Sequence, residues 1–400
     1  MINLKYYNEQ SNSICETIAE YKVNYNNSIS NDKVEEILDF ILKSAIELNA
    51  SDIHLDLIST SMTVKFRIDS LLRTFVVLDS RYSNQIIRFI KLKCNIDISK
   101  TLHPLEGRFS LEVSKLSMDC RISIIPTIKG EKLTIRLLNV KDYGWNVEQI
   151  GFNIEELNII KRKINALNGF ILICGPTGSG KSTTLCALIN EINDGTKNII
   201  TIEDPVEYFI DGVVQVNIAK GENYRFSNML KFSLRQDPDV LMIGEIRDQE
   251  TADISLKASI TGHLVFSTIH TKSSIGVVER LIDLEMQPYM VADAVSLIIN
   301  QRLVRTLCSK CKSIDSSNYN NLFEGAKIYK PIGCQECLGT GYKGRKAVFE
   351  ILEITSDDSE LIRNKQWSKL ENKFISLETK ILDMIKRGDT SVEEGYRYIF

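Results

Sequence analysis

The chain has 400 residues and a formal net charge of −3, with 43% hydrophobic and 25% charged residues. This length and composition are typical of a soluble globular protein with two domains, which excludes disorder as the main state. The 21 glycines and 7 prolines are too few for a collagen-like or low-complexity chain. Because the net charge is close to zero, a protein that binds nucleic acid over its whole surface is also disfavoured.

The sequence carries no signal for membrane insertion or export. It has no run of 18 apolar residues, and its first residues lack the basic and apolar regions of a signal peptide. We therefore expect a cytoplasmic protein that contacts a membrane only through partners.

The first part of the chain predicts a small α+β domain over residues 31–142. Residues 1–30, rich in Asn, Ser and Tyr, are predicted to form a short N-terminal extension. Apolar residues at helical spacing from Val34 to Ile46 predict a helix, and a second helix is expected over 83–94. Alternating apolar and polar residues predict strands over 51–56, 62–69, 71–78, 107–113, 117–125 and 132–138.

The pattern changes in the second part of the chain, residues 143–400. Helices are expected over 154–167, 181–192, 226–234 and 250–259, and they alternate with apolar strands over 170–174, 199–202, 240–243 and 264–268. This alternation predicts an α/β domain with a mostly parallel sheet that helices cover on both faces. From Gln301 onward we expect an element with two cysteine pairs, followed by helices.

A phosphate-binding loop is the most specific feature of the second part. The residues from Gly175 to Ser182 fit the pattern G-x-x-x-x-G-K-[ST], after an apolar strand and at the start of a helix. Backbone N–H groups of such a loop and the helix N-terminus attract phosphate. Lys181 is expected to reach the β- and γ-phosphates, and the Ser182 hydroxyl to bind Mg²⁺. The expected nucleotide-binding residues are Gly175, Pro176, Thr177, Gly178, Ser179, Gly180, Lys181, Ser182 and Thr183.

Acidic residues follow two of the predicted strands. In a simple phosphate-loop protein an Asp at the end of a neighbouring strand holds Mg²⁺, but Gly244 occupies that place here and Glu245 follows it. We therefore expect Glu245 to polarise an attacking water, and Glu203, Asp204 or Glu207 to support Mg²⁺ through water. The alternative for each is a solvated acid at a strand end.

Two of the four histidines, His263 and His270, bracket a predicted strand. A histidine at the end of a parallel strand can form a hydrogen bond with a γ-phosphate, which makes His270 a candidate catalytic residue. A packing or surface role is equally compatible with the pattern.

Together these motifs resemble the secretion-type ATPases, the GspE/PilB-like motors of type II secretion and type IV pilus assembly. Besides the phosphate loop, the matching segments are 200–208, 234–248, 261–271, 301–308 and 339–345. The resemblance implies a RecA-like ATPase domain preceded by a smaller PAS-like domain, with protomers assembled into a homohexameric ring. It also implies ATP and Mg²⁺ as ligands and an inner-membrane platform protein as partner. The ring is then expected to be cytoplasmic and to bind peripherally at the inner membrane.

The resemblance further implies that arginines of the small domain reach the nucleotide. The matching candidates are Arg67, Arg108, Arg121 and Arg136, of which Arg67 and Arg108 are expected to take part in catalysis. A guanidinium suits this role because it stays charged and forks onto phosphate oxygens. For any single arginine, a surface salt bridge is the alternative.

Four of the nine cysteines form two C-x-x-C pairs, Cys308/Cys311 and Cys334/Cys337. Such pairs predict a tetrahedral zinc site with a structural role, in an element over 308–337 of the second domain. The alternative is four free or redox-active thiols. Assembly-type members of the family carry a tetracysteine element, which favours extension or secretion over retraction.

We therefore expect a hexameric motor ATPase that powers assembly of a type IV pilus, a pseudopilus or a type II secretion machine. One alternative is a nucleic-acid translocase, but the chain lacks a basic, aromatic-rich strip, so we expect no direct contact with nucleic acid. Another is a nucleotide-dependent scaffold without hydrolysis. The presence of Lys181, Ser182, Glu203 and Glu245 together argues against it.

Overall fold

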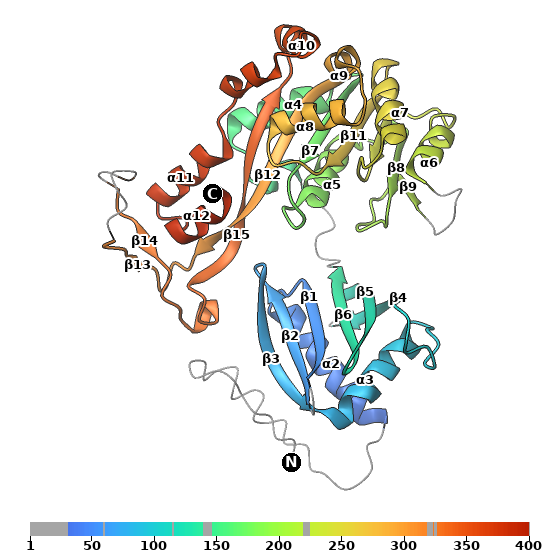
Figure 1. The fold of residues 1–400 in the computed structure, drawn as a ribbon, viewed down its shortest axis with the longest axis vertical. Coiled ribbons are helices and arrows are strands. Elements are labelled where there is room, and N and C mark those ends of the chain that lie inside the picture. The colour runs from blue at the N-terminus through green and yellow to red at the C-terminus, as the bar shows by residue number, and fades with distance from the viewer. Residues whose placement is uncertain are drawn as a thin grey trace. The chain divides into compact units, whose positions relative to one another are not determined.

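The computed structural model describes residues 31–58, 61–113, 116–138, 146–218, 225–317, 323 and 326–399, with elements labelled in Figure 1. The expected extension over residues 1–30 lies outside these residues. The chain divides into two compact units, one within Met1–Asp142 and Ile332–Lys343, the other within Tyr143–Pro331 and Gly344–Phe400. In the described part, no helix is both long and apolar enough to span a bilayer.

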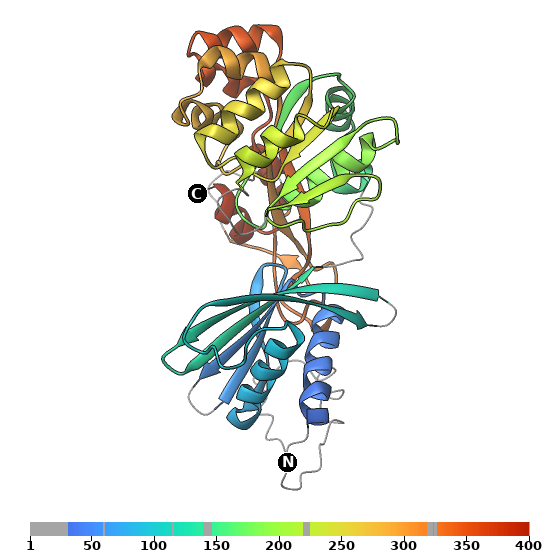
Figure 2. The same ribbon diagram turned by 90° about the vertical axis from the view of Figure 1, so that its right-hand side faces the viewer.

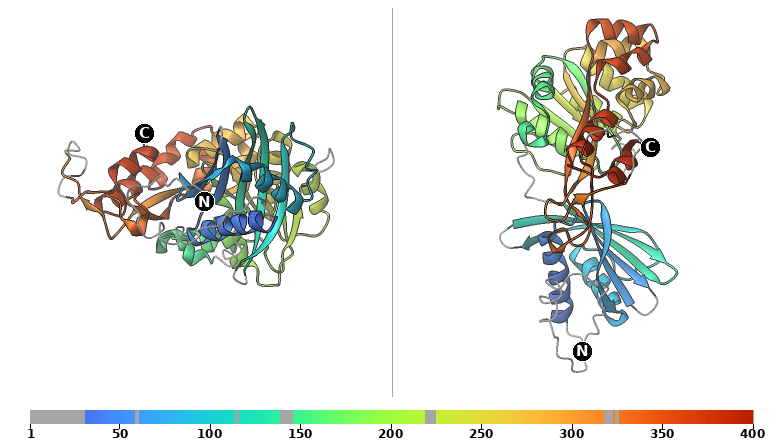
Figure 3. Two further views of the ribbon diagram at one scale, coloured as in Figure 1. Left: turned by 90° about the horizontal axis from the view of Figure 1, so that it is seen from below. Right: turned by 90° about the vertical axis from the view of Figure 1, so that its left-hand side faces the viewer.

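The first unit contains a six-stranded antiparallel sheet with the order β3-β2-β1-β6-β5-β4. Two helices lie on the same face of this sheet, as the side views in Figures 2 and 3 agree. The elements are α2 (Asn31–Glu47), β1 (Asp52–Ile58), β2 (Ser61–Ile68), β3 (Leu71–Asp79), α3 (Ser80–Lys93), β4 (Leu105–Val113), β5 (Leu116–Thr127) and β6 (Gly130–Leu138).

The face of this sheet that the helices cover is apolar. Alternate residues of a strand point to the same face. Phe66, Ile53, Ile135 and Ile122 are neighbours across four strands, and all are buried in one core with apolar residues of α2 and α3. The residues between them along each strand therefore lie on the opposite face, where the candidate arginines are found.

The first unit also includes the segment Ile332–Lys343, although we expected the whole element 308–337 to belong to the second domain. This segment contains the short helix η3 (Gln335–Cys337). Arg73 of β3 donates a hydrogen bond to the carbonyl oxygen of Leu338, which is a physical reason for the grouping.

The second unit is built on a seven-stranded sheet with the order β15-β12-β7-β11-β10-β8-β9. The pairings from β12 to β9 are parallel, as the alternation of strands and helices predicted. The strands of this sheet are β7 (Gly169–Cys174), β8 (Ile199–Glu203), β9 (Val214–Asn217), β10 (Val240–Ile243), β11 (Leu264–Ile269), β12 (Val295–Leu307) and β15 (Tyr342–Glu353).

Helices cover both faces of this sheet (Figure 1). Ile171 and Ile173 of β7 pack with α4 and α5 on one face, whereas Phe170 and Leu172 pack with α7, α8 and α9 on the other. The remaining elements are η2 (Val147–Ile150), α4 (Ile154–Ile164), α5 (Lys181–Ile192), α6 (Phe226–Ser233), α7 (Gln249–Ile260), α8 (Ser274–Asp283), α9 (Pro288–Ala294), β13 (Ser313–Ile314), β14 (Tyr329–Lys330), α10 (Ser356–Arg363), η4 (Trp367–Lys373), α11 (Leu377–Lys386) and α12 (Val392–Ile399).

The prediction for the chain beyond Gln301 was incomplete, because two long strands, β12 and β15, belong to the sheet there. Every residue of β12 is buried or half-buried. The strand therefore lacks the alternation of apolar and polar residues that is typical of a strand with one face exposed to solvent. After the buried Tyr342, β15 continues with the run 343–346, whose residues are all exposed and whose sequence is typical of a loop. The expected helices follow these strands.

Candidate active site

The phosphate loop connects the end of β7 to the start of α5. Gly175, Gly178 and Gly180 have φ angles of 144°, 78° and 87°, a region that favours glycine. A β-carbon on Gly175 would lie 2.5 Å from the carbonyl oxygen of Gln301, and one on Gly180 would lie 2.9 Å from Gln301 Nε2. Backbone conformation and the close approach of β12 therefore both require glycines in this loop.

Lys181 is oriented by the loop itself. Its Nζ donates hydrogen bonds to the carbonyl oxygens of Gly175 at 2.9 Å and Pro176 at 3.0 Å. Burial lowers the pKa of Lys181, while the carboxylates of Glu245 and Glu207 favour its charged form. The ammonium group is thus largely desolvated and held beside the loop's backbone, an arrangement suited to phosphate oxygens.

Glu245 and His270 come together at the carboxyl ends of β10 and β11. The Thr268 hydroxyl donates a hydrogen bond to the carbonyl oxygen of Gly244 at 2.7 Å, which ties the two strand ends together. The Glu245 carboxylate forms an ion pair with Arg247, and its Oε2 lies 3.6 Å from His270 Nε2. The phosphate loop begins at the same edge of the sheet, where ligands bind in open α/β sheets.

Glu203, at the end of β8, is buried with its carboxylate already bonded. Its Oε1 accepts hydrogen bonds from Thr201 Oγ1 at 2.7 Å and Gln215 Nε2 at 3.1 Å. Burial raises the pKa of Glu203. Glu207 acts electrostatically on both Glu203 and Lys181, so its carboxylate lies in the same neighbourhood. Glu207 is therefore near both Glu203 and Lys181, and the side chains of Thr201 and Gln215 hold Glu203.

His263 lies at the other end of β11 from His270. Its Nδ1 donates a hydrogen bond to the carbonyl oxygen of Ala258 at 2.9 Å. This contact is local to the turn between α7 and β11, so the two histidines do not share a site.

The four candidate arginines lie in one row across the sheet of the first unit, on the face opposite its helices. We call this set, in the order Arg67, Arg136, Arg121 and Arg108 on β2, β6, β5 and β4, the arginine row. Asp52 on β1 stands between the first two and pairs with Arg67 at 3.7 Å and Arg136 at 3.2 Å. The side chains of Arg108 and Arg121 have no ion-pair or hydrogen-bond partner among the residues that the structure describes.

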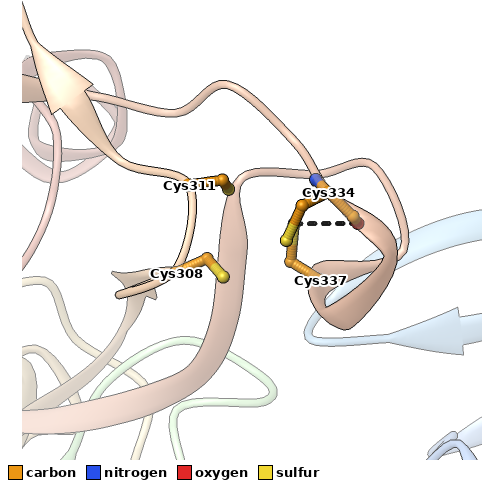
Figure 4. A group of neighbouring side chains, drawn as sticks. All are labelled: Cys308, Cys311, Cys334 and Cys337. Carbon is orange, nitrogen blue, oxygen red and sulfur yellow. Dashed lines mark hydrogen bonds between the residues drawn. The ribbon is translucent and has the colours of Figure 1, made fainter.

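The four paired cysteines bring their sulfur atoms together (Figure 4). All four Sγ atoms lie within 4.8 Å of one another, and those of Cys334 and Cys337 are 3.7 Å apart. Four thiolates about 2.3 Å from one zinc ion in a tetrahedron would be about 3.8 Å apart. The backbone N–H groups of Cys334 and Gly341 donate to the Cys337 sulfur, both at 3.1 Å, as is common for ligand thiolates. The cluster therefore fits a tetrahedral ion such as zinc.

Three polar residues of β12 that have no predicted role, Asn300, Gln301 and Arg302, contact the phosphate loop and the segment after His270 through their side chains. The segment 301–308 is among those that resemble the secretion ATPases, so the sequence does mark these residues. It does not predict their contact with the phosphate loop, because that contact depends on strand β12 lying next to β7.

A phosphate loop between a parallel strand and a helix, with its lysine at the start of the helix, defines the class of phosphate-loop nucleotide-binding proteins. The family model described as "Type II/IV secretion system protein" matches residues 27–397, and the chain belongs to this family.

Named relatives and solved structures agree with this family. The type II secretion system ATPase E of Vibrio cholerae is 36% identical over 374 residues, which span 90% of this chain and 74% of the relative. The type IV pilus assembly ATPase PilB of Myxococcus xanthus is 36% identical over 378 residues, or 90% and 67%. The pilus retraction motor PilT with bound ADP has a TM-score of 0.62 at 25% identity, covering 90% of this chain and 95% of PilT.

The ATPase DotB of Legionella pneumophila has a TM-score of 0.72 at 18% identity, covering 94% of this chain and 97% of DotB, and shows the likeness of fold alone. The family and the ATPases among its relatives make this chain an ATP-hydrolysing enzyme. The resemblance inferred from the motifs is thereby confirmed.

Proposed function

We propose that the chain is a motor that hydrolyses ATP as a homohexamer to drive assembly of a type II secretion machine, a pseudopilus or a type IV pilus. The observation that carries this proposal is the meeting of the phosphate loop with Glu245 and His270 at one edge of the sheet of the second unit, in a chain related to secretion and pilus-assembly ATPases. The proposed place of action is the cytoplasmic side of an inner membrane, at a platform protein.

In the proposed mechanism, the loop residues 175–183 bind the phosphates of ATP and Lys181 neutralises their charge. The Ser182 hydroxyl and the carboxylate of Glu207 would hold Mg²⁺, a cation that prefers such oxygen ligands. When bound, the ion supplies charge neutralisation at the β- and γ-phosphates. Glu245 orients a water molecule for attack, and His270 contacts the γ-phosphate. Glu203, held by Thr201 and Gln215, supports this arrangement.

The arginine row supplies a testable part of the proposed mechanism. Arg67 already shares the carboxylate of Asp52 with Arg136, whereas the side chain of Arg108 is exposed and unpaired among the described residues. We expect Arg108→Ala to lower kcat at saturating ATP at least about tenfold, the effect of losing one charge-assisted hydrogen bond to phosphate, and Arg67→Ala to have a smaller effect. Lys132→Ala is the matched control, because Lys132 is on the same sheet and pairs with Asp56 at 2.7 Å. Equal turnover in all three variants would contradict a role for the row.

The cysteine cluster predicts one zinc ion per chain with a structural role. We expect Cys337→Ser to lose the ion and to lower the melting temperature, because folding energy of such an element comes from metal binding. The measurement is metal content by mass spectrometry, together with thermal unfolding. Cys94→Ser is the control, since burial raises the pKa of Cys94 to about 11 and leaves a protonated thiol there. A wild-type chain that holds no zinc would favour the alternative of free thiols, and a Cys337→Ser chain that keeps full zinc content would exclude Cys337 as a ligand.

The experiment that tests the proposed function is ATP hydrolysis by the purified chain together with its mass in solution, with and without ATP. Hexamers that hydrolyse ATP equally well with and without DNA are expected. Stimulation of hydrolysis by DNA would favour a translocase. A stable oligomer that binds ATP without hydrolysing it would favour a scaffold.

A further inference from the structure

One strand, β12, touches two loops of the site through side chains on its opposite faces. Successive side chains of a strand point to opposite faces of the sheet. Gln301 lies on the face of Leu297 and Ile299, which pack with α5. Asn300 and Arg302 therefore lie on the other face, where α8 begins.

On the first face, Gln301 uses both ends of its amide group to hold the phosphate loop. The residue is 2% exposed. Its Nε2 donates a hydrogen bond to the carbonyl oxygen of Ser179 at 2.8 Å, and its Oε1 accepts one from Thr184 Oγ1 at 2.8 Å. Ser179 lies in the loop and Thr184 in the first turn of α5, so a single side chain fixes both parts of the phosphate-binding segment.

On the second face, Asn300 and Arg302 hold the backbone just after His270. Arg302 Nη2 and Asn300 Nδ2 donate to the carbonyl oxygen of Lys272, at 2.7 Å and 3.1 Å. Arg302 Nη1 donates to Asn300 Oδ1 at 2.8 Å, which locks the two side chains together. The same Nη1 lies 3.2 Å from the position of a β-carbon on Gly175. The guanidinium thus stands between the first residue of the phosphate loop and the segment 271–274.

Glu350, buried in β15, completes the support on this second face. Its Oε1 accepts hydrogen bonds from the backbone N–H of Ser274 at 2.9 Å and from Asn300 Nδ2 at 3.3 Å. Because Ser274 is the first residue of α8, the start of that helix is fixed to β12 and β15. The segment between His270 and α8 therefore has little freedom to move unless β12 moves with it.

We propose that Gln301 and Arg302 are positioning residues that couple nucleotide binding in the phosphate loop to the position of His270 beside Glu245. A displacement of Ser179 moves β12 through the hydrogen bond of Gln301. The displaced strand then moves Lys272, two residues from His270, through the hydrogen bond of Arg302. This inference rests on the proposed function in one respect, that His270 and Glu245 act on the nucleotide. It adds the residues through which the segment after His270 responds to nucleotide in the phosphate loop.

The test is hydrogen exchange of the full chain with and without ADP, which lacks the γ-phosphate that His270 would meet directly. In the wild type, ADP is expected to slow exchange in residues 175–184 and also in 271–276, the latter about tenfold, a typical coupling between sites. In Arg302→Met, ADP is expected to protect only residues 175–184. In Gln301→Met, ADP is expected to bind about tenfold more weakly and, at saturation, to leave 271–276 unprotected.

Ser259→Ala is the matched control, because it removes a buried hydrogen bond, to the carbonyl oxygen of Ala294 at 3.2 Å, in the same unit but away from both loops. It is expected to keep both protected regions. If Arg302→Met does not fold, Arg302→Lys replaces it. Arg302 donates to the carbonyl oxygen of Lys272 through Nη2 and to that of Gln301 through Nη1, at 2.7 Å and 2.9 Å, and a single ammonium group lacks this forked geometry. Protection of 271–276 that persists in the Arg302 variant, or that is missing in the wild type, overturns the coupling. Normal ATP hydrolysis by the same wild-type sample would then leave the proposed function standing.

Discussion

Lys181→Ala is expected to lower ATP turnover at least about 100-fold, comparable to the loss of one preorganised charge at the reacting group. The variant removes the ammonium group that Gly175 and Pro176 hold at the mouth of the loop. No other cationic side chain forms hydrogen bonds with loop carbonyls in the described part of the chain, so no neighbour replaces it. The fold should survive, because alanine at the start of α5 favours the helix. Phosphate release measured at saturating ATP checks this expectation.

The matched control for this prediction is Lys197→Ala, which removes a lysine whose partner is the exposed Asp194. It should leave turnover unchanged, since exposed ion pairs of this kind contribute little. If Lys181→Ala keeps a tenth or more of the wild-type turnover while the melting temperature is unchanged, the loop does not bind the transferred phosphate as argued. ATP binding measured on the same samples separates lost affinity from lost chemistry.

The parts of the fold that could be predicted from the sequence are those that depend on interactions between residues close together in the chain. The phosphate loop is a contiguous pattern, and its glycines have the positive φ angles that its backbone requires. The helix expected over 181–192 is α5 with the same bounds, because its start follows directly from the loop. The strands of the first unit were also predicted, since one face is buried and the residues alternate.

The parts that the sequence did not predict depend on which strands are neighbours. The arginine row is spread over β2, β6, β5 and β4, and only the pairing register brings Arg67 and Arg136 to the same Asp52. In the same way, Gln301 lies 122 residues from Ser179 along the chain, and no local pattern joins them. The role of a buried strand such as β12 is also hard to predict, because its polar residues interrupt an apolar run without a regular period.

Glu245→Gln is expected to abolish ATP hydrolysis while ATP remains bound. Glutamine has the same shape but does not accept the proton of an attacking water, and loss of such a base typically costs 100-fold or more, about 10² to 10⁴. Binding should be retained, because the change removes a negative charge that lies near the phosphate loop and acts on Lys181. Single-turnover hydrolysis and titration with labelled ATP measure the two quantities. If Glu245 is the base of the motor, the Glu245→Gln chain binds ATP but no longer hydrolyses it.

Two further variants decide between Glu245 and its neighbours. Glu250→Gln, which removes an exposed acid paired with Lys231, should hydrolyse ATP normally. Glu203→Gln should impair hydrolysis less than Glu245→Gln, because Thr201 and Gln215 already occupy an oxygen of the Glu203 carboxylate and burial raises its pKa. The reverse order, with Glu203→Gln inactive and Glu245→Gln active, would move the base from the end of β10 to the end of β8. The ion pair of Glu245 with Arg247 and its closeness to His270 would then serve to orient the strand ends rather than to activate water.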